Sequence, residues 1–211
     1  SFFRKIMKPL FFDIETAGSS KDFDSLHPEM QDAWLVTGKF EEHYPKECAL
    51  IPEFGQVVCC TFAYEKNGEL KIITETDIIS IQTIFLNSRE FTPCGWNIKG
   101  FDIPFLNKHF LKNGLKIPAI LSLWDPKVEE IKKPWLVKVL DLQEIWKQNG
   151  FNSCKFNSAC VFLGIESPKD DIDGSQVHEA FWNGEIERIK TYCEKDVISL
   201  HKMYNKIIHL L

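Results

Sequence analysis

The chain has 211 residues, which is enough for one α/β domain with a sizeable core. It is too short for two domains that each have a core of that size. Hydrophobic residues make up 44% and charged residues 26%, a globular composition that excludes wholesale disorder. The net charge of −5 argues against a nucleic-acid partner held by a basic surface. Bound divalent cations would remove that objection by neutralising clustered carboxylates.

Cysteine usage and hydropathy indicate the compartment. The seven cysteines form no C-x-x-C pair and no set with zinc-finger spacing. Several lie in apolar runs such as VVCCTF and NSACVFL, where a reduced cysteine behaves as a small hydrophobe. The sequence shows neither a signal peptide nor an apolar stretch of about 18 residues. We therefore expect a cytoplasmic protein with no membrane contact.

The first part of the chain predicts strands. KPLFFDIET is an apolar run that ends in acids and predicts a buried strand at residues 9–15. Residues 17–56 are polar, contain three prolines and show no strand pattern, so we expect an excursion with one or two short helices whose aromatic residues still pack. VVCCTFAYE and LKIITE then predict two strands joined by a hairpin turn at Asn67 and Gly68.

Helical patterns dominate the rest. DIISIQTIFLNS predicts a helix capped by Asp77, FTPCGWN a short central strand, and FDIPFLNKHFLKNG a helix that ends before Gly114. A mixed segment with Trp124 and Trp135 leads to VLDLQEIWKQ, followed by a helix over KFNSACVFLGI, the polar loop ESPKDDIDGSQ and closing helices through Leu211. This order predicts an α/β fold, a mixed sheet with helices packed on it.

Asp13 and Glu15 are the first candidate functional residues. Residues two apart on a strand point to the same face, so both carboxylates project together at the carboxyl end of the strand, where α/β sheets commonly place ligands. Two carboxylates so close repel each other when ionised, and a divalent cation relieves that repulsion. The alternative is that this D-x-E merely ends a strand and meets water.

Asp102, in GWNIKGFDIPFL, has a structural alternative of its own. An aspartate at the start of a helix with Pro104 in the first turn is a normal N-cap arrangement. Taken alone, this residue is interpreted as a helix cap.

Tyr192 and Asp196, in TYCEKDVISL, lie four residues apart on one helix face, with side chains roughly 5–6 Å apart at Cβ. The buried stripe of Ile189, Val197 and Leu200 places Asp196 near the core boundary. A carboxylate there needs a partner, for which a metal and a lysine are both candidates. We interpret the three residues between the pair as spacers.

The three segments together resemble the motifs of the DEDD exonuclease superfamily, which has the RNase H-like fold. FFDIET, GWNIKGFDIPFL and YCEKDV correspond to its motifs I, II and III. The residues of these motifs are especially similar to those of the exonuclease domain of family-B DNA polymerases and of the stand-alone bacterial proteins related to it. The resemblance covers residues 9–205, so we expect a single exonuclease domain over residues 1–211, with 17–56 as an excursion within it.

The resemblance implies a two-metal mechanism with Mg²⁺ or Mn²⁺. Asp13 would bridge both ions, Glu15 and Asp196 would complete the site of the water-activating ion, and Asp102 would hold the second. Tyr192 would orient the attacking water, because a phenol with a pKa near 10 is a poor base at neutral pH. In the superfamily, the residue that assists the water is either a histidine five residues before the last aspartate or a tyrosine four residues before it. The chain therefore resembles the tyrosine (DEDDy) subclass.

Substrate contacts are also implied by the resemblance. Asn97 and Phe101 match positions beside the terminal nucleotides, where stacking on an aromatic ring tolerates any base. The acids of the 166–176 loop are expected to be solvated, although the overlapping segment KDDIDGSQV, residues 169–177, resembles one that flanks the site in family-B exonucleases. Four lysines could line an approach path, but we interpret them as solvated surface residues: Lys99, Lys108, Lys155 and Lys169.

The leading functional prediction is a metal-dependent 3′→5′ exonuclease that acts on single-stranded DNA and releases nucleoside 5′-monophosphates. An exoribonuclease of the RNase D type is the nearest alternative, because recognition of the 2′-OH depends on pocket details. A non-catalytic nucleic-acid-binding module is a third, since fold alone does not establish function. No polymerase domain fits within this length, so a polymerase or repair partner would be a separate chain.

Overall fold

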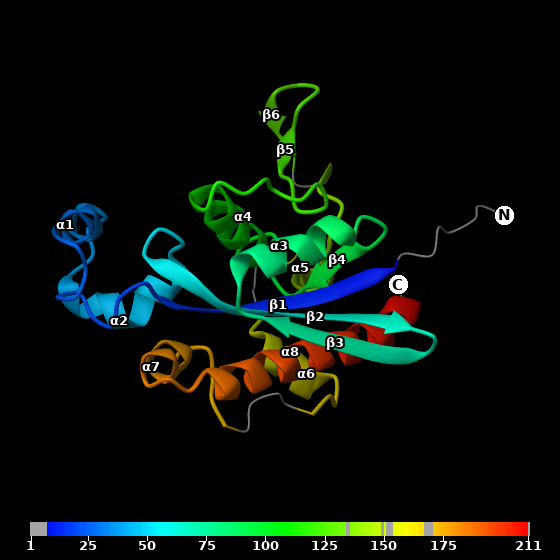
Figure 1. Cartoon of the computed structure of the whole chain (residues 1–211). Coiled ribbons are helices and arrows are strands. Elements are labelled where there is room, and N and C mark those ends of the chain that lie inside the picture. The colour runs from blue at the N-terminus through cyan, green and yellow to red at the C-terminus, as the bar shows by residue number, and fades with distance from the viewer. Residues whose placement is uncertain (1–7, 134–135, 149, 151–153, 167–170, 211) are drawn as a thin grey trace.

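A five-stranded mixed sheet forms the centre of the molecule. The computed structural model describes residues 8–133, 136–148, 150, 154–166 and 171–210. β1 pairs antiparallel with β2 and parallel with β4, and β4 pairs parallel with β7, in the order β3-β2-β1-β4-β7 (Figure 1). The expected mixed sheet is therefore confirmed. Its strands are β1 (Pro9–Gly18), β2 (Gly55–Lys66), β3 (Glu69–Glu75), β4 (Thr92–Gly95) and β7 (Leu140–Asp141).

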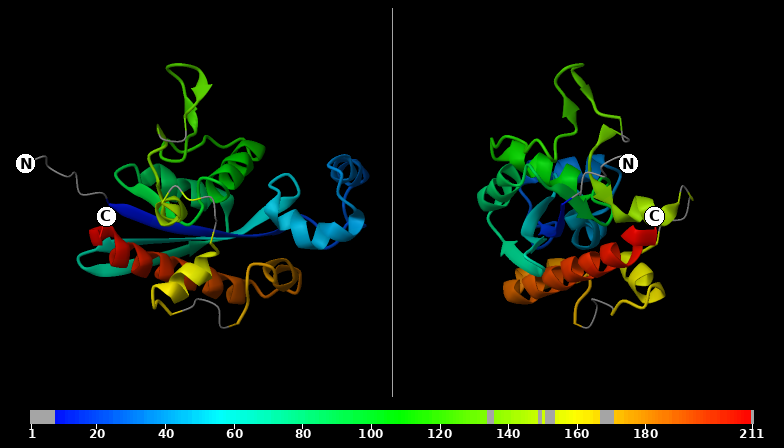
Figure 2. Two further views of the ribbon diagram at one scale, coloured as in Figure 1. Left: turned by 180° about the vertical axis from the view of Figure 1, so that it is seen from behind. Right: turned by 90° about the vertical axis from the view of Figure 1, so that its right-hand side faces the viewer.

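Helices cover both faces of this sheet (Figures 1 and 2). One face carries α3 (Ile78–Asn87) and α4 (Asp102–Lys112); the other carries α6 (Phe156–Phe162), α7 (Val177–Trp182) and α8 (Ile186–Ile207). The short α5 (Leu142–Lys147) follows β7 directly, and the 3₁₀ turn η4 (Ile208–Leu210) follows α8. None of the described helices combines the length and apolar character that crossing a bilayer requires.

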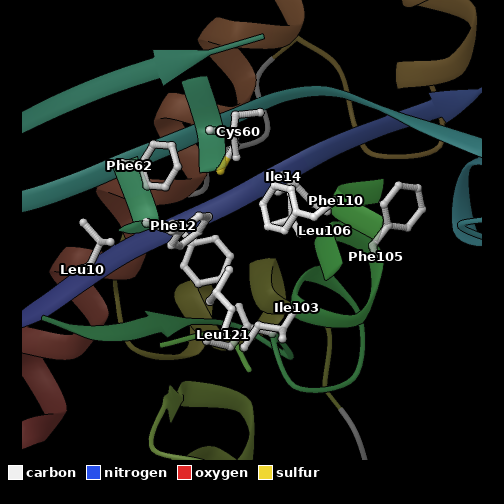
Figure 3. Packing of buried hydrophobic residues seen from close by; sticks show 13 residues of the cluster. Leu10, Phe12, Ile14, Cys60, Phe62, Ile103, Phe105, Leu106, Phe110 and Leu121 are labelled. Atoms are coloured by element: carbon white, nitrogen blue, oxygen red, sulfur yellow. The ribbon is translucent and has the colours of Figure 1, made fainter. Parts of the chain in front are cut away.

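Side-chain alternation along β1 distributes its residues between two cores. Its even-numbered residues from 10 to 14 join the buried cluster on the side of α3 and α4 (Figure 3). Phe11 and Ala17 instead pack in clusters with side chains of α8. Because alternate residues of a strand share a face, Asp13 and Glu15 lie on the α8 face, between these two apolar residues. The two acids thus lie between two apolar clusters that β1 forms with α8.

The excursion between β1 and β2 has a small core of its own. It contains α1 (Pro28–Val36), α2 (Tyr44–Glu47) and the 3₁₀ turns η1 (Glu41–His43) and η2 (Cys48–Leu50), and no strand, as expected. Trp34 and Tyr44 are fully buried against each other, with ring centroids 5.1 Å apart. His178 of α7 connects this segment to the sheet, since its Nδ1 accepts from the Gly18 N–H at 2.9 Å and its Nε2 donates to the Lys21 carbonyl at 2.9 Å.

Local signals for turns and caps are confirmed. Asn67 and Gly68 have φ angles of 55° and 80°, as a two-residue hairpin turn of type I′ requires. Asp77 caps α3 by accepting a hydrogen bond from the Ser80 N–H at 2.8 Å. Gly114, with φ of 67°, follows the end of α4.

The segment between α4 and α6 contains elements that the sequence did not assign. It holds β7, α5 and a hairpin of β5 (Trp124–Asp125) and β6 (Glu130–Ile131). Each of these strands has only two residues, too few for a periodic pattern. Trp135 and Lys169 lie outside the described residues, and the 166–176 loop is described only at Glu166 and from residue 171 onward.

Substituting Gly18 with alanine should destabilise the fold where the excursion leaves β1. A Cβ atom there would overlap Cys48 Sγ and lie 2.8 Å from His178 Cε1. We expect the G18A substitution to lower the free energy of unfolding in urea by about 1–3 kcal/mol. The matched control is G174A, because a Cβ at Gly174 meets no atom within 4 Å. Equal stabilities of the two variants would contradict this account of the β1 exit.

Candidate active site

β1 contributes two carboxylates that face the same side. Carboxylate oxygens of Asp13 and Glu15 and the Sγ of Cys193 all lie within 4.8 Å of one another. Asp13 is half-buried, whereas Glu15 keeps only 7% of its surface exposed. The pairing of β1 with β2 shifts register immediately after Glu15, so the regular ladder is interrupted where the acids end.

Asp102 approaches the same point from α4. It is 3% exposed, and its Oδ1 accepts a hydrogen bond from the backbone N–H of Ile14 at 3.3 Å. That N–H is available because β4 pairs with β1 only as far as Phe11. The interpretation of Asp102 as a helix cap is wrong: Phe101 occupies the cap position without a side-chain bond, and the carboxylate turns toward β1.

α8 contributes Tyr192 and Asp196 on one face, as the sequence predicts. Asp196 is 9% exposed, Tyr192 is half-buried, and the two side chains are neighbours on this face. The spacer interpretation is wrong for two of the three residues between them. Cys193 is fully buried and its thiol faces Asp13 Oδ2 at 3.7 Å, while Glu194 accepts a hydrogen bond from Thr74 at 2.7 Å.

One cavity of about 510 Å³ brings these side chains together. It is lined by every candidate residue from the sequence, namely Asp13, Glu15, Asn97, Phe101, Asp102, Tyr192 and Asp196. A larger hollow of about 760 Å³ lies beside the amino ends of β4 and β7, and Glu90 is the only acid among the described residues that line it. We therefore place the candidate active site in the smaller cavity.

The cavity also contains residues that the sequence did not single out as site residues. Trp96 follows β4, Gln143 lies in the first turn of α5, and Cys154 and Lys155 precede α6. No local pattern marks them, apart from the position of Trp96 next to Asn97. Lys155 is exposed and is the only cation among the described lining residues.

The other lysines behave as the sequence suggested. Lys99 forms an ion pair with Glu144 at 2.6 Å, and Lys108 pairs with Glu53 at 2.7 Å. Neither lysine lines the cavity. Lys155 is exposed, as the surface interpretation predicts, but it alone of the described members of that set also lines the cavity.

Burial and mutual repulsion shape the electrostatics. Burial, followed by the charges of Asp102 and Asp196, raises the pKa of Asp13 well above its usual value. Burial, followed by Asp13 and Asp196, does the same to the pKa of Glu15. Burial raises the pKa of Asp102 to about 7. Within the described residues, no ion pair involves Asp13, Glu15 or Asp102.

This donor set fits divalent cations. The carboxylates are buried side by side, and oxygen ligands of this kind suit hard cations such as Mg²⁺ and Mn²⁺. A bound cation would remove the repulsion that raises these pKa values. Tyr192 stays a neutral phenol in this setting, since burial and then the charge of Asp196 raise its pKa.

Comparison with known proteins identifies a family and similar solved structures. A family model described as a predicted 3′-5′ exonuclease related to the exonuclease domain of PolB matches residues 56–211, so β1 lies outside the matched range. No curated protein matches the sequence. Among solved structures, the family B DNA polymerase from the hyperthermophilic archaeon Pyrobaculum calidifontis is similar, with a TM-score of 0.62 at 15% identity over 96% of this chain and 24% of the polymerase.

The structural match identifies the fold. At 15% identity it concerns the fold alone, and its coverage of 96% of the chain confirms the expected RNase H-like architecture. The chain spans about a quarter of the polymerase, 24% of its length.

Stability should depend on pH through these acids. A carboxyl group with a raised folded-state pKa stabilises the protein below its unfolded pKa, and this contribution is lost as pH rises through the folded value. In buffer free of divalent cations, the free energy of unfolding should therefore fall as pH rises from about 4, the unfolded pKa of an aspartate, to about 7, the folded pKa of Asp102. For Asp102, with a pKa of about 7, the loss should be about 2 kcal/mol or more.

The D102N variant provides the control. An asparagine can still accept the hydrogen bond from Ile14 but has no charge to titrate. Urea titrations at several pH values should show a shallower pH dependence for D102N than for the unmodified chain. Identical slopes would show that Asp102 is not protonated preferentially in the folded state.

Proposed function

The chain belongs to the family of predicted 3′-5′ exonucleases related to the exonuclease domain of PolB, and on this premise we propose that it removes nucleotides from the 3′ end of single-stranded DNA as nucleoside 5′-monophosphates. The observation that supports this proposal is the convergence of Asp13, Glu15, Asp102, Tyr192 and Asp196, from three distant segments, on one cavity. The proposal treats residues 1–211 as one exonuclease domain with 17–56 as an excursion.

Four acids of the cavity would hold the cofactors, which we propose are two Mg²⁺ or Mn²⁺ ions. Asp13, Glu15 and Asp196 lie on the α8 side, and Asp102 enters from α4. The chemistry that such ions supply when bound is activation of water and stabilisation of charge on the leaving oxygen. Burial raises the pKa of Asp13 and Glu15, and a bound cation would favour their charged form.

Tyr192 would orient the attacking water. Its phenol lies beside the Asp196 carboxylate, and the phenol oxygen can accept a hydrogen bond from the attacking water. The raised pKa of Tyr192 excludes a role as a strong base at neutral pH. Its contribution is therefore positional.

The remaining lining residues suit a strand terminus. Phe101 and Trp96 are half-buried aromatic rings on which bases can stack without sequence preference. Asn97 is exposed beside them and offers amide hydrogen bonds. Lys155 would pair with a backbone phosphate, which gives an acidic protein a local attraction for nucleic acid.

A digestion assay tests the proposal. With 5′-labelled single-stranded DNA and either Mg²⁺ or Mn²⁺, we expect a descending ladder of products. The D13N variant should lower the rate at least about 100-fold, because it removes one negative charge from the metal-binding carboxylates. The D24N variant is the control, since Asp24 is exposed and does not line the cavity.

Other outcomes would change the assignment. Matched RNA degraded faster than DNA would make the enzyme an exoribonuclease. Cleavage of neither substrate with either cation, together with no cation binding by calorimetry, would make the chain a non-catalytic binding module.

Lys155 should affect substrate binding rather than chemistry. We expect K155A to raise the KM for DNA roughly tenfold with little change in kcat, and to reduce the salt dependence of log kcat/KM by about one unit of slope. Kinetics at several salt concentrations measure both effects. K108A is the matched control, because Lys108 is exposed and already paired with Glu53. Equal salt slopes for the two variants would exclude a phosphate contact by Lys155.

A further inference from the structure

Asp141 lies next to the cavity without lining it. It is the last residue of β7, it is 4% exposed, and its pairing partner is Gly95, which ends β4. The loop that begins after Gly95 carries Asn97 and Phe101 and leads into Asp102. Asp141 is therefore in position to act on the cavity wall through the backbone.

Its carboxylate is fully engaged by backbone N–H groups. Oδ1 accepts from Asn97 at 2.9 Å and from Gln143 at 3.0 Å. Oδ2 accepts from Lys99 at 3.0 Å. A buried carboxylate that receives several backbone N–H bonds is well compensated, and each of these bonds is charge-assisted.

The loop needs such an anchor because its own conformation is strained. Asn97 has φ of 58°, in the left-handed region that residues other than glycine rarely adopt. A Cβ at Gly100 would lie 2.6 Å from Asn97 Oδ1, so a side chain there would require the Asn97 side chain to move. The N–H groups of Gly100 and Phe101 both bond the Asn97 carbonyl, so the loop turns tightly around one residue.

The same carboxylate also binds a second segment of the cavity wall. Asp141 is the N-cap of α5, and Gln143 in the first turn of that helix lines the cavity. One side chain thus binds the backbone of two segments that contribute to the site. Moving it would displace both.

We propose that Asp141 is a positioning residue for the exonuclease site. Its carboxylate fixes the position of the 96–101 loop relative to the start of α5. This inference rests on the proposed function. Both carboxylate oxygens must accept hydrogen bonds: Oδ1 accepts from Asn97 and Gln143, and Oδ2 accepts from Lys99. An asparagine offers one acceptor and one donor, so D141N can still cap α5 and bond Asn97 but turns an N–H₂ group toward the Lys99 N–H.

The test compares D141N with D77N. Asp77 is likewise an N-cap, of α3, and bonds only residues of its own helix start. Because asparagine caps helices about as well as aspartate, both variants should fold. We expect amide hydrogen exchange at Asn97 and Lys99, followed by NMR, to quicken at least tenfold in D141N and to stay unchanged in D77N.

Kinetics on single-stranded DNA provide the second readout. The kcat/KM of D141N should fall at least tenfold at a temperature where both variants are folded, while that of D77N should match the unmodified chain. Unchanged exchange at Lys99, or unchanged kcat/KM in an active enzyme, would overturn the proposal for Asp141. An unmodified chain that degrades no nucleic acid contradicts the proposed function instead, and the exchange measurement then decides whether Asp141 anchors the loop.

Discussion

Repulsion among buried carboxylates is the constraint around which this molecule is built. Asp13 and Glu15 lie on a strand face between Phe11 and Ala17, two residues that belong to apolar cores. Burial together with the neighbouring acids keeps the pKa values of both carboxyl groups high. Clustered carboxylates destabilise the fold when no cation is bound and become favourable ligands when cations bind. The same carboxylates therefore account for the destabilisation and for the proposed chemistry.

The site forms where regular structure stops. β4 ends at Gly95 and pairs with β1 only as far as Phe11, which leaves the Ile14 N–H to meet Asp102. Departures from regular pairing beside a cavity are typical of functional sites, because the freed backbone groups and side chains can serve a ligand. The strained Asn97 loop lies in the same gap and depends on hydrogen bonds from outside its own segment.

β1 and the segment after it tie the molecule together. The family match begins at residue 56, yet half of the acidic side chains of the cavity come from β1, and the likeness to the polymerase structure covers 96% of the chain. α8 contacts β1 through Cys193, and α7 holds the end of β1 through His178. The two helices therefore fix the strand on either side of Glu15.

Local geometry made much of this predictable from the sequence. Strand alternation placed Asp13 and Glu15 on one face, and helical spacing placed Tyr192 beside Asp196, because both relations involve only near neighbours in the chain. The sequence alone also indicated the sheet and the resemblance to a superfamily. Only the tertiary structure decided that Asp102 bonds β1 rather than capping α4, and that Asp141 binds the Asn97 loop. Those contacts join residues far apart in sequence, and β7, which carries Asp141, is too short for a periodic signal.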